Sequence, residues 1–321
     1  MNAKNDSNEI KITRLYDAPV KRVWEAWTDI QQVVQWWGPR GFTLTNHSKD
    51  LRPGGSWVYT MHGPDGVDYP NKTHYYEVEK EARLVYDHGA SGDKPALFRV
   101  EVLFSDLHGK TKMDMRVILP TPQAAAETRA FIKKAGGDAT WDRLAEFLGK
   151  ELSAKELFVI NRSFEAPLET LFEMWIDPKH FSQWIAPKGF TTKFEKSDIR
   201  EGGSSFYSMT DASGKMTMYG KAKYLEVRRP DRLVYTQQFC DENEKVSRHP
   251  MAPTWPETML TTVLLAEEGP NQTRVTVNWE VYGKATPEEV ETFKKSRGGM
   301  TQGWTGSFDK LEHYLAASHA R

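Results

Sequence analysis

The chain has 321 residues, with 43 basic and 44 acidic side chains and a formal net charge of −1. That length suits two domains better than one hydrophobic core, and the balanced charge excludes a global field that recruits nucleic acid or an anionic membrane. No run approaches the roughly 18 apolar residues that span a bilayer, and the single cysteine, Cys240, excludes an intrachain disulfide. We therefore expect a cytoplasmic protein with no nucleic-acid or membrane partner.

An internal repeat runs through the sequence. The stretch QWWGPRGF at 35–42 returns as QWIAPKGF at 183–190, and the offset is 148 positions (184 minus 36 for the shared Trp). Between 12–42 and 160–190, 12 of 31 positions are identical at this offset. Two copies with so long a period indicate a duplicated domain and not a solenoid of short repeats.

The repeat sets the domain boundaries. We predict a first domain at 1–152 and a second at 153–321, because the second copy of the pattern begins shortly after residue 153. The joint at 149–155 contains no long Pro/Gly linker. A short joint predicts that the two domains are held close, as a pseudo-dimer.

Each copy begins with a strand and two helices. Segments 10–16 and 157–164 read as strands, and each is followed by an acidic residue and Ala-Pro. Pro19 and Pro167 stand where a helix begins without wasting an N–H group. Apolar residues then recur at i, i+3, i+4 and i+7, which predicts amphipathic helices: Val20, Val23, Trp24 and Trp27 in the first copy, and Leu168, Leu171, Phe172 and Trp175 in the second. Short second helices are predicted at about 30–37 and 178–185.

The middle of each copy is predicted to be antiparallel sheet. Paired glycines at 54–55 and 202–203 mark the start of a hairpin. Trp57, Tyr59 and Met61 alternate with polar residues, as in a strand with one large apolar face. Further strands are predicted at 73–78, 83–87, 97–104 and 112–119 in the first copy, and at 221–227, 232–238, 258–265 and 273–282 in the second.

Each copy closes with a long helix. The helices are predicted at 121–148, with a break at Gly136-Gly137, and at 286–317, with a break near Gly298-Gly299. The order of one strand, two helices, several antiparallel strands and a long helix predicts an α+β fold. Its curled sheet has one face covered by the last helix.

Five short motifs occur in the same order in both copies. They are R-x-(Y/F)-(D/E)-A-P, (W/F)-x-x-W, W-x-x-P-x-G-F, R-x-G-G and R-L-V-Y. In this combination each copy resembles the activator of Hsp90 ATPase homologue 1-like domains of the START/Bet v 1-like superfamily. The resemblance implies a helix-grip fold, in which an antiparallel sheet wraps the C-terminal helix and two short helices close one end of a cavity.

The two copies differ at a motif near the final helix. Such domains often carry Gly-Trp ahead of the final helix. The second copy has Gly303-Trp304, whereas the first has Gly136-Gly137. The resemblance therefore implies that the pocket or the helix end differs between the copies.

Catalytic and metal-binding motifs are missing from the sequence. It contains no HExxH, GxSxG, GxGxxG or CxxC pattern, and no pair of histidines at helical spacing. His62 and His74, near the expected cavity strands of the first copy, are the weak candidates for acid–base catalysis. Cys240 has no evident His partner that would activate it. We expect no metal and no cofactor.

Bulky apolar side chains with occasional polar tips form the stronger signal. Methionine adapts its shape and aromatic rings give flat walls, which suits a small hydrophobic ligand. Alternation alone does not distinguish a filled core from a hollow one, and Trp36 and Trp184 are expected to be scaffold. The expected ligand-binding residues are Trp37, Trp57, Tyr59, Met61, Tyr76, Phe98, Met113 and Met115 in the first copy, and Tyr207, Met209, Met218, Tyr224, Met259, Trp279 and Trp304 in the second, with Met216 and Tyr219 beside them.

Three functions stay open from the sequence. Binding of a small hydrophobic or aromatic molecule is the leading hypothesis. Co-chaperone activity, with a chaperone as partner, is implied by the resemblance, but both halves are the same module. An enzyme of the cyclase/aromatase or hydrolase kind found in the wider superfamily would need a polar group in the cavity, for which His62, His74, Glu77 and Glu226 are the candidates.

Overall fold

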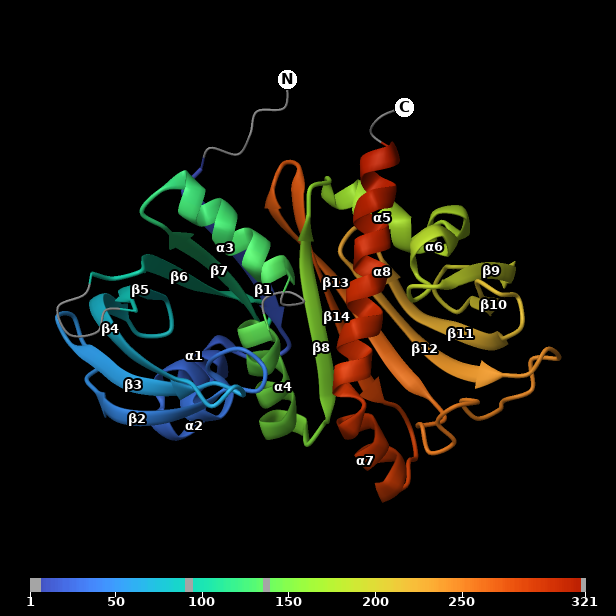
Figure 1. Cartoon of the computed structure of the whole chain (residues 1–321), viewed down its shortest axis with the longest axis horizontal. Coiled ribbons are helices and arrows are strands. Elements are labelled where there is room, and N and C mark those ends of the chain that lie inside the picture. Colours follow the sequence, from blue (N-terminus) through green and yellow to red (C-terminus); the bar gives the residue numbers. More distant parts are fainter. Residues whose placement is uncertain (1–6, 90–94, 135–138, 319–321) are drawn as a thin grey trace. The chain divides into compact units, whose positions relative to one another are not determined.

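A computed structural model describes residues 7–89, 95–134 and 139–318 of the chain. The chain divides into two compact units, Met1–Ala154 and Lys155–Arg321, here called unit one and unit two. Each unit contains one seven-stranded sheet (Figure 1). The strand order is β1-β7-β6-β5-β4-β3-β2 in unit one and β8-β14-β13-β12-β11-β10-β9 in unit two, so the topology is duplicated along with the sequence.

The elements of unit one follow the order expected from the sequence, and every strand pair described is antiparallel. They are β1 (Glu9–Tyr16), α1 (Val20–Thr28), α2 (Ile30–Trp36), β2 (Thr43–Lys49), β3 (Ser56–His62), β4 (Asp68–Glu79), β5 (Arg83–His88), β6 (Phe98–Leu107), β7 (Lys110–Ile118), α3 (Pro122–Lys134) and α4 (Ala139–Ser153).

Unit two repeats the order, again with antiparallel pairing. Its elements are β8 (Leu157–Phe164), α5 (Leu168–Ile176), α6 (Pro178–Trp184), β9 (Phe190–Ser197), β10 (Ser204–Asp211), β11 (Thr217–Arg228), β12 (Arg232–Cys240), β13 (Met259–Gly269), β14 (Gln272–Val281), α7 (Pro287–Lys295) and α8 (Arg297–Ser318).

The structure departs from the predicted elements in two places. The edge strands β2 and β9 were not predicted, because their residues are mostly exposed and show no continuous apolar face. The break in the second closing helix falls at Ser296, so Gly298 and Gly299 lie in the first turn of α8. The break predicted at Gly136-Gly137 lies outside the described residues.

The two short helices of each unit are fixed by the same pair of contacts. The carboxylate of Asp29 accepts from the Gln31 N–H at 2.7 Å and caps α2, and Asp177 caps α6 from Lys179 N–H at 2.8 Å. The Trp36 indole donates to the Ala26 carbonyl at 3.0 Å. Trp184 makes the matching 3.0 Å bond to Met174. Both tryptophans are almost fully buried, as expected of scaffold.

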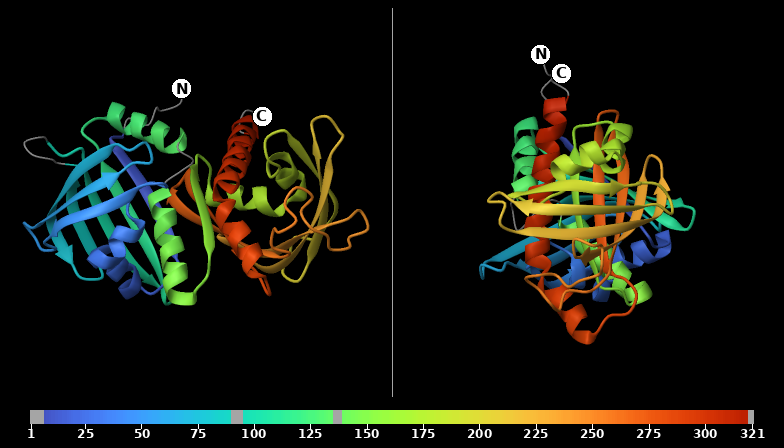
Figure 2. Two further views of the ribbon diagram at one scale, coloured as in Figure 1. Left: turned by 60° about the horizontal axis from the view of Figure 1, so that its bottom comes forward. Right: turned by 90° about the vertical axis from the view of Figure 1, so that its right-hand side faces the viewer.

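An ion pair joins the closing helix to the first strand of each sheet; it is buried in unit one, whereas its Asp309 carboxylate is half exposed in unit two. Arg14 on β1 lies 2.9 Å from Asp142 on α4, and Arg162 on β8 lies 2.6 Å from Asp309 on α8. Helix α8 lies along the inner side of the curved sheet of unit two (Figure 2). Its Phe308 and Leu311 side chains are buried in the core of that unit. The α+β helix-grip fold is therefore confirmed in both units.

Candidate functional site

Unit two encloses a cavity of about 410 Å³. Its walls are the inner faces of strands β9 to β14, the helices α6 and α8, and residues 249–257 from the loop that joins β12 to β13. The lining is mostly aromatic and aliphatic. A cavity of this size lies within the range of pockets that hold small organic ligands.

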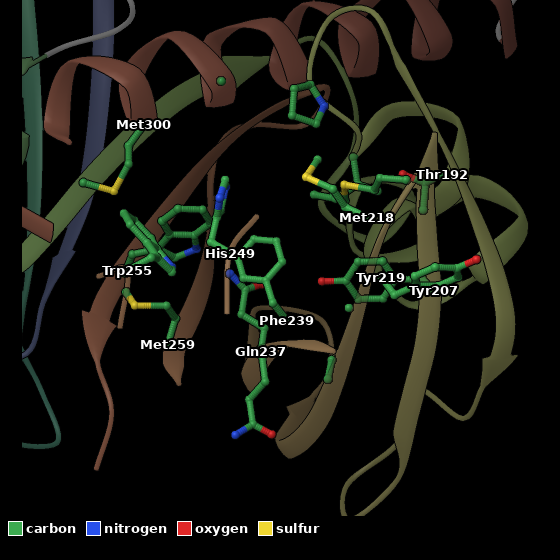
Figure 3. A pocket seen from close by; sticks show the side chains of 18 of the residues that line it. Thr192, Tyr207, Met218, Tyr219, Gln237, Phe239, His249, Trp255, Met259 and Met300 are labelled. Atoms are coloured by element: carbon green, nitrogen blue, oxygen red, sulfur yellow. The ribbon is translucent and has the colours of Figure 1, made fainter. Parts of the chain in front are cut away.

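The cavity has two differently lined ends. One end carries hydroxyl groups on aromatic rings and a threonine, and the other carries an indole ring and two methionines (Figure 3). Figure 3 shows Thr192, Tyr207, Met218 and Tyr219 towards one end, Trp255, Met259 and Met300 at the other, and Gln237, Phe239 and His249 between them.

The ligand-binding residues predicted for the second copy meet in this cavity. Its lining includes Tyr207, Met209, Met218, Tyr224, Met259, Trp279 and Trp304. Tyr219 also lines it, whereas Met216 does not. Contact of these side chains with a ligand stays a prediction.

Tyr207 places a phenol group at the cavity wall. Its ring lies over Gly220, its cross-strand neighbour: a Cβ added at Gly220 would lie 2.5 Å from Cζ and Oη of Tyr207. Burial raises the pKa of Tyr207 far above physiological pH, so the phenol stays neutral. Among the residues that the structure describes, no protein group hydrogen-bonds to this hydroxyl.

The loop at 241–258 contributes lining residues that the sequence prediction missed. Thr254 Oγ1 lies 2.9 Å from Thr292 Oγ1 on α7, and Arg248 pairs with Glu289 on the same helix. The Glu289 carboxylate also accepts from the Thr286 N–H at 2.8 Å, which completes a capping box at the start of α7. A signal was present in the sequence: this connection has 18 residues, against nine between β5 and β6 in unit one.

In unit one the corresponding space is filled by indole rings. Only about 10 Å³ remains between Trp27, Trp37 and Trp57 and their neighbours. The ring centroids of Trp37 and Trp57 lie 5.3 Å apart, and Trp141 stacks on Trp27 at 5.1 Å with an angle of 5°. Thus Trp37 and Trp57 are core residues in this structure, and the space that they border is too small for a ligand.

Other predicted ligand residues of the first copy pack against protein side chains in the described part of unit one. Met113 and Met115 are buried in the core, Met61 is partly buried, and Phe98 stacks on His88 at 4.8 Å. Tyr59 is fully buried; its Oη accepts from the Trp37 indole at 3.2 Å and shares a 3.3 Å hydrogen bond with His88 Nδ1. These contacts satisfy the phenol within the protein.

Tyr76 was assigned to the wrong face of the sheet. It is 42% exposed and donates to Asp87 at 2.8 Å, whereas Tyr75 is buried. A bulge between Tyr75 and Glu77 shifts the register, and the same bulge follows Tyr224 in β11. The inward counterpart of Tyr224 is therefore Tyr75.

None of the four acid–base candidates lines the cavity. His62 bonds Asp68 at 2.6 Å and Thr45 at 2.8 Å on the outer side of the sheet, and His74 packs edge-on against Tyr76. Glu77 pairs with Arg83 at 2.7 Å, and Glu226 pairs with Arg232 at 2.8 Å. Their predicted catalytic roles have no support in the geometry.

Apart from its tyrosines, the titratable residues that line the cavity are His249 and Glu257. Burial lowers the pKa of His249, and its Nδ1 accepts from the Met251 N–H at 3.0 Å, so the ring is held neutral. Cys240 is buried beside the cavity, and burial raises the pKa of its thiol, which makes a thiolate nucleophile unfavourable. Across residues 7–89, 95–134 and 139–318, no group of three His, Cys, Asp or Glu side chains is close enough to hold a metal.

No helix in the described part of the chain combines the length and the apolar character needed to cross a bilayer.

Comparison with protein families gives a match over most of the chain. The family model described as activator of Hsp90 ATPase homolog 1-like protein matches residues 17–149 and 165–316, which are most of both units. A search of curated proteins gives no significant match.

Solved structures are similar at low identity. An NMR structure from Arthrobacter aurescens is 24% identical, with a TM-score of 0.43, and covers 50% of this chain and 86% of that one. Protein Ms6760 from Mycobacterium smegmatis is 19% identical, with a TM-score of 0.42, over 50% and 90%. The di-domain aromatase/cyclase BexL of the BE-7585A biosynthetic pathway is 11% identical, with a TM-score of 0.37, over 95% and 98%. These values carry no argument about function.

Proposed function

The chain belongs to the activator of Hsp90 ATPase homolog 1-like family, and we propose that it binds a small, mainly aromatic molecule in the cavity of unit two. The observation that carries this proposal is the cavity of about 410 Å³, at a place where the duplicated unit leaves about 10 Å³. Natural cores are close-packed, with few voids larger than a water molecule. A space of this size, where the described residues of the other copy pack closely, is best explained by an occupant.

The shape of the walls favours a flat ligand. The rings of Trp279 and Trp304 meet at 5.6 Å and 72°, and Trp255 packs edge-on against Trp279 at 6.4 Å. Rings arranged in this way offer both faces and edges to another aromatic ring. Met259 and Met300 lie at the same end and can adapt to its outline.

Thermal unfolding against a panel of flavonoids, aromatic polyketides, sterols and fatty acids tests the proposal. A ligand at 100 times its dissociation constant adds about 2.7 kcal/mol to the free energy of unfolding, which raises the melting temperature by roughly 2–4 °C for a domain of this size. We expect a shift from one aromatic class.

Hydrogen exchange supplies the internal control for that experiment. Peptides from β9 to β13 and from the loop at 241–258 should gain protection with the ligand, while peptides of unit one stay unchanged. Protection confined to unit one, or no shift with any class, would contradict the proposal.

A further inference from the structure

We infer that the cavity of unit two selects neutral, flat ligands that carry a carbonyl or hydroxyl oxygen, which Tyr207 and Gln237 bind, and that it excludes anionic amphiphiles. The inference rests on the proposed function and names the class of ligand. Two independent observations carry it: the charge of the lining, and the loss of two hydrogen-bond partners that unit one retains.

The lining contains no cation that could neutralise an anionic ligand. Among the described residues around the cavity there is no Lys or Arg, and the one carboxylate, Glu257, would repel an anion. Nearby cations have partners elsewhere: Lys310 donates to the carbonyls of Ala186, Pro187 and Phe190 at 2.8–3.0 Å, and Arg248 pairs with Glu289. A buried anion without a partner is strongly unfavourable.

Tyr207 has lost the partners that its counterpart keeps. Tyr59, the same residue 148 positions earlier, is bonded to Trp37 and His88. In unit two the Trp37 position is Ile185, which has no donor, and the His88 position is Gln237, two residues after the shared Arg-Leu-Val-Tyr. Both substitutions remove a bond that satisfied the phenol.

Gln237, which lies between the two ends of the cavity, is another polar group of the lining without a protein partner. Its side chain is partly buried and lines the cavity, and within the described ranges no hydrogen bond of its amide is found. Figure 3 shows it between the two ends, on the strand next to the one that carries Tyr219. A phenol offers one donor and an acceptor, and a carboxamide offers two donors and an acceptor.

The position of the Tyr207 hydroxyl depends on Gly220. The corresponding cross-strand partner of Tyr59 is Asn71, whose side chain is buried and bonds the Tyr69 carbonyl at 2.9 Å. With no side chain at Gly220, the ring of Tyr207 can lie across β11 with its hydroxyl at the wall. A ligand oxygen at this place can accept a hydrogen bond from the neutral Tyr207 hydroxyl. In an apolar space a hydroxyl left unpaired is unfavourable, so the site favours ligands with an oxygen there over ligands without one.

Three probes on one ring system test the inference. Fluorene has no polar group, fluorenone adds a neutral carbonyl and fluorene carboxylate adds an anion; titration against the intrinsic tryptophan fluorescence of the full chain gives each dissociation constant. We expect fluorenone to bind about 2- to 10-fold more tightly than fluorene, the value of one net hydrogen bond. Fluorene carboxylate should bind at least about 100-fold more weakly than fluorenone.

Matched variants separate the hydroxyl from the ring. Tyr207→Phe and Gln237→Leu should each lower the preference for fluorenone over fluorene while leaving fluorene binding within about twofold. Tyr59→Phe is the control, because it removes the same hydroxyl from the filled core and should not change that preference. Should one variant fail to fold, the three probes on the wild-type chain and the other variant still test the inference.

The outcomes distinguish this inference from the proposed function. Binding of fluorene and fluorenone with equal affinity, or a carboxylate that binds as tightly as fluorenone, would overturn the inference alone. A preference that survives in both variants would overturn the assigned roles of Tyr207 and Gln237. If none of the three probes binds, the proposal that the cavity takes flat aromatic molecules fails, and the inference fails with it.

Discussion

In unit one the ring centroids of Trp37 and Trp57 lie 5.3 Å apart in the core. In unit two the positions 148 residues later are Ile185 and Ser205. The ion pair from the first strand to the closing helix, the caps of the short helices and the indole bonds of Trp36 and Trp184 are the same in both. A few side chains on a constant scaffold therefore decide whether the interior is solid or hollow.

The difference also separates two tasks. Unit one buries aromatic rings against one another and satisfies its phenol internally, which stabilises a rigid core. Unit two keeps a cavity and a phenol without a protein partner in the described region, which lowers stability and favours binding. Substitutions that exchange the two sets of residues test this separation.

The largest effect on ligand affinity is expected from Ile185→Trp, which puts the unit-one side chain into the cavity wall of unit two. The indole would occupy space that the ligand needs, so affinity for fluorenone should fall by at least about 100-fold, or about 2.7 kcal/mol. Fluorescence titration measures it, and circular dichroism checks the fold. Unchanged affinity would place the ligand elsewhere.

The reciprocal change, Trp37→Ile, should destabilise unit one. Trp37 is 7% exposed, packs against Trp27 and Trp57, and donates to Tyr59, so its loss leaves a void and an unsatisfied phenol. We expect a loss of about 2–4 kcal/mol in the free energy of unfolding. Urea unfolding followed by pulse proteolysis, with peptides of each unit resolved by mass spectrometry, measures it. A similar loss in unit two would show that the units do not unfold separately.

A third contrast is in pH dependence. Burial lowers the pKa of His88 to about 4, whereas an unfolded histidine titrates near 6.5, and unit two has Gln237 at this position. Between these values the unfolded state binds more protons, so the stability of unit one rises with pH from about 4 to about 6.5 and is complete above that.

His88→Gln should flatten that rise by up to about 3 kcal/mol. The same proteolysis assay across pH 4 to pH 7 measures the slope for each unit. The slope of unit two should not respond to the substitution. If the slope of unit one is also unchanged, the histidine is not buried neutral in solution.

The smallest effect is expected from Gly220→Ala. The new Cβ would lie 2.5 Å from the Tyr207 hydroxyl, so the ring must turn away from the wall. Fluorenone should bind about 2- to 10-fold more weakly, and fluorene should change less. Thermal unfolding should shift little, because the displaced atoms are the end of a side chain. Equal effects on both probes would mean that the substitution acts through cavity volume instead of the hydroxyl.

The repeat made much of the fold predictable. Its constant offset located the strands, the short helices and the closing helices, and alternation put Tyr207, Met209 and Met218 on the inner face, where they line the cavity. Alternation reports which face a residue is on and not how full the space behind that face is. Alternation therefore could not predict that the interior around Trp37 and Trp57 is filled.

The remaining misses have local physical causes. A bulge exchanges the faces of neighbouring residues, which put Tyr76 inside and left out Tyr75. The loop at 241–258 has no period, so the place of His249 and Trp255 in the wall depends on tertiary contacts such as Arg248 to Glu289. Sequence patterns carry no information about those contacts.

The contact between Arg248 and Glu289 means that Glu289 stabilises two segments at once. Its carboxylate holds the loop through Arg248 and closes the capping box of α7 with Thr286, so the order of the loop and the order of the helix start are thermodynamically coupled. Coupling of this kind is reciprocal: whatever steadies one segment steadies the other by the same factor. Hydrogen exchange at the first amides of α7 therefore reports on the order of the loop at 241–258, although none of the described lining residues belongs to helix α7.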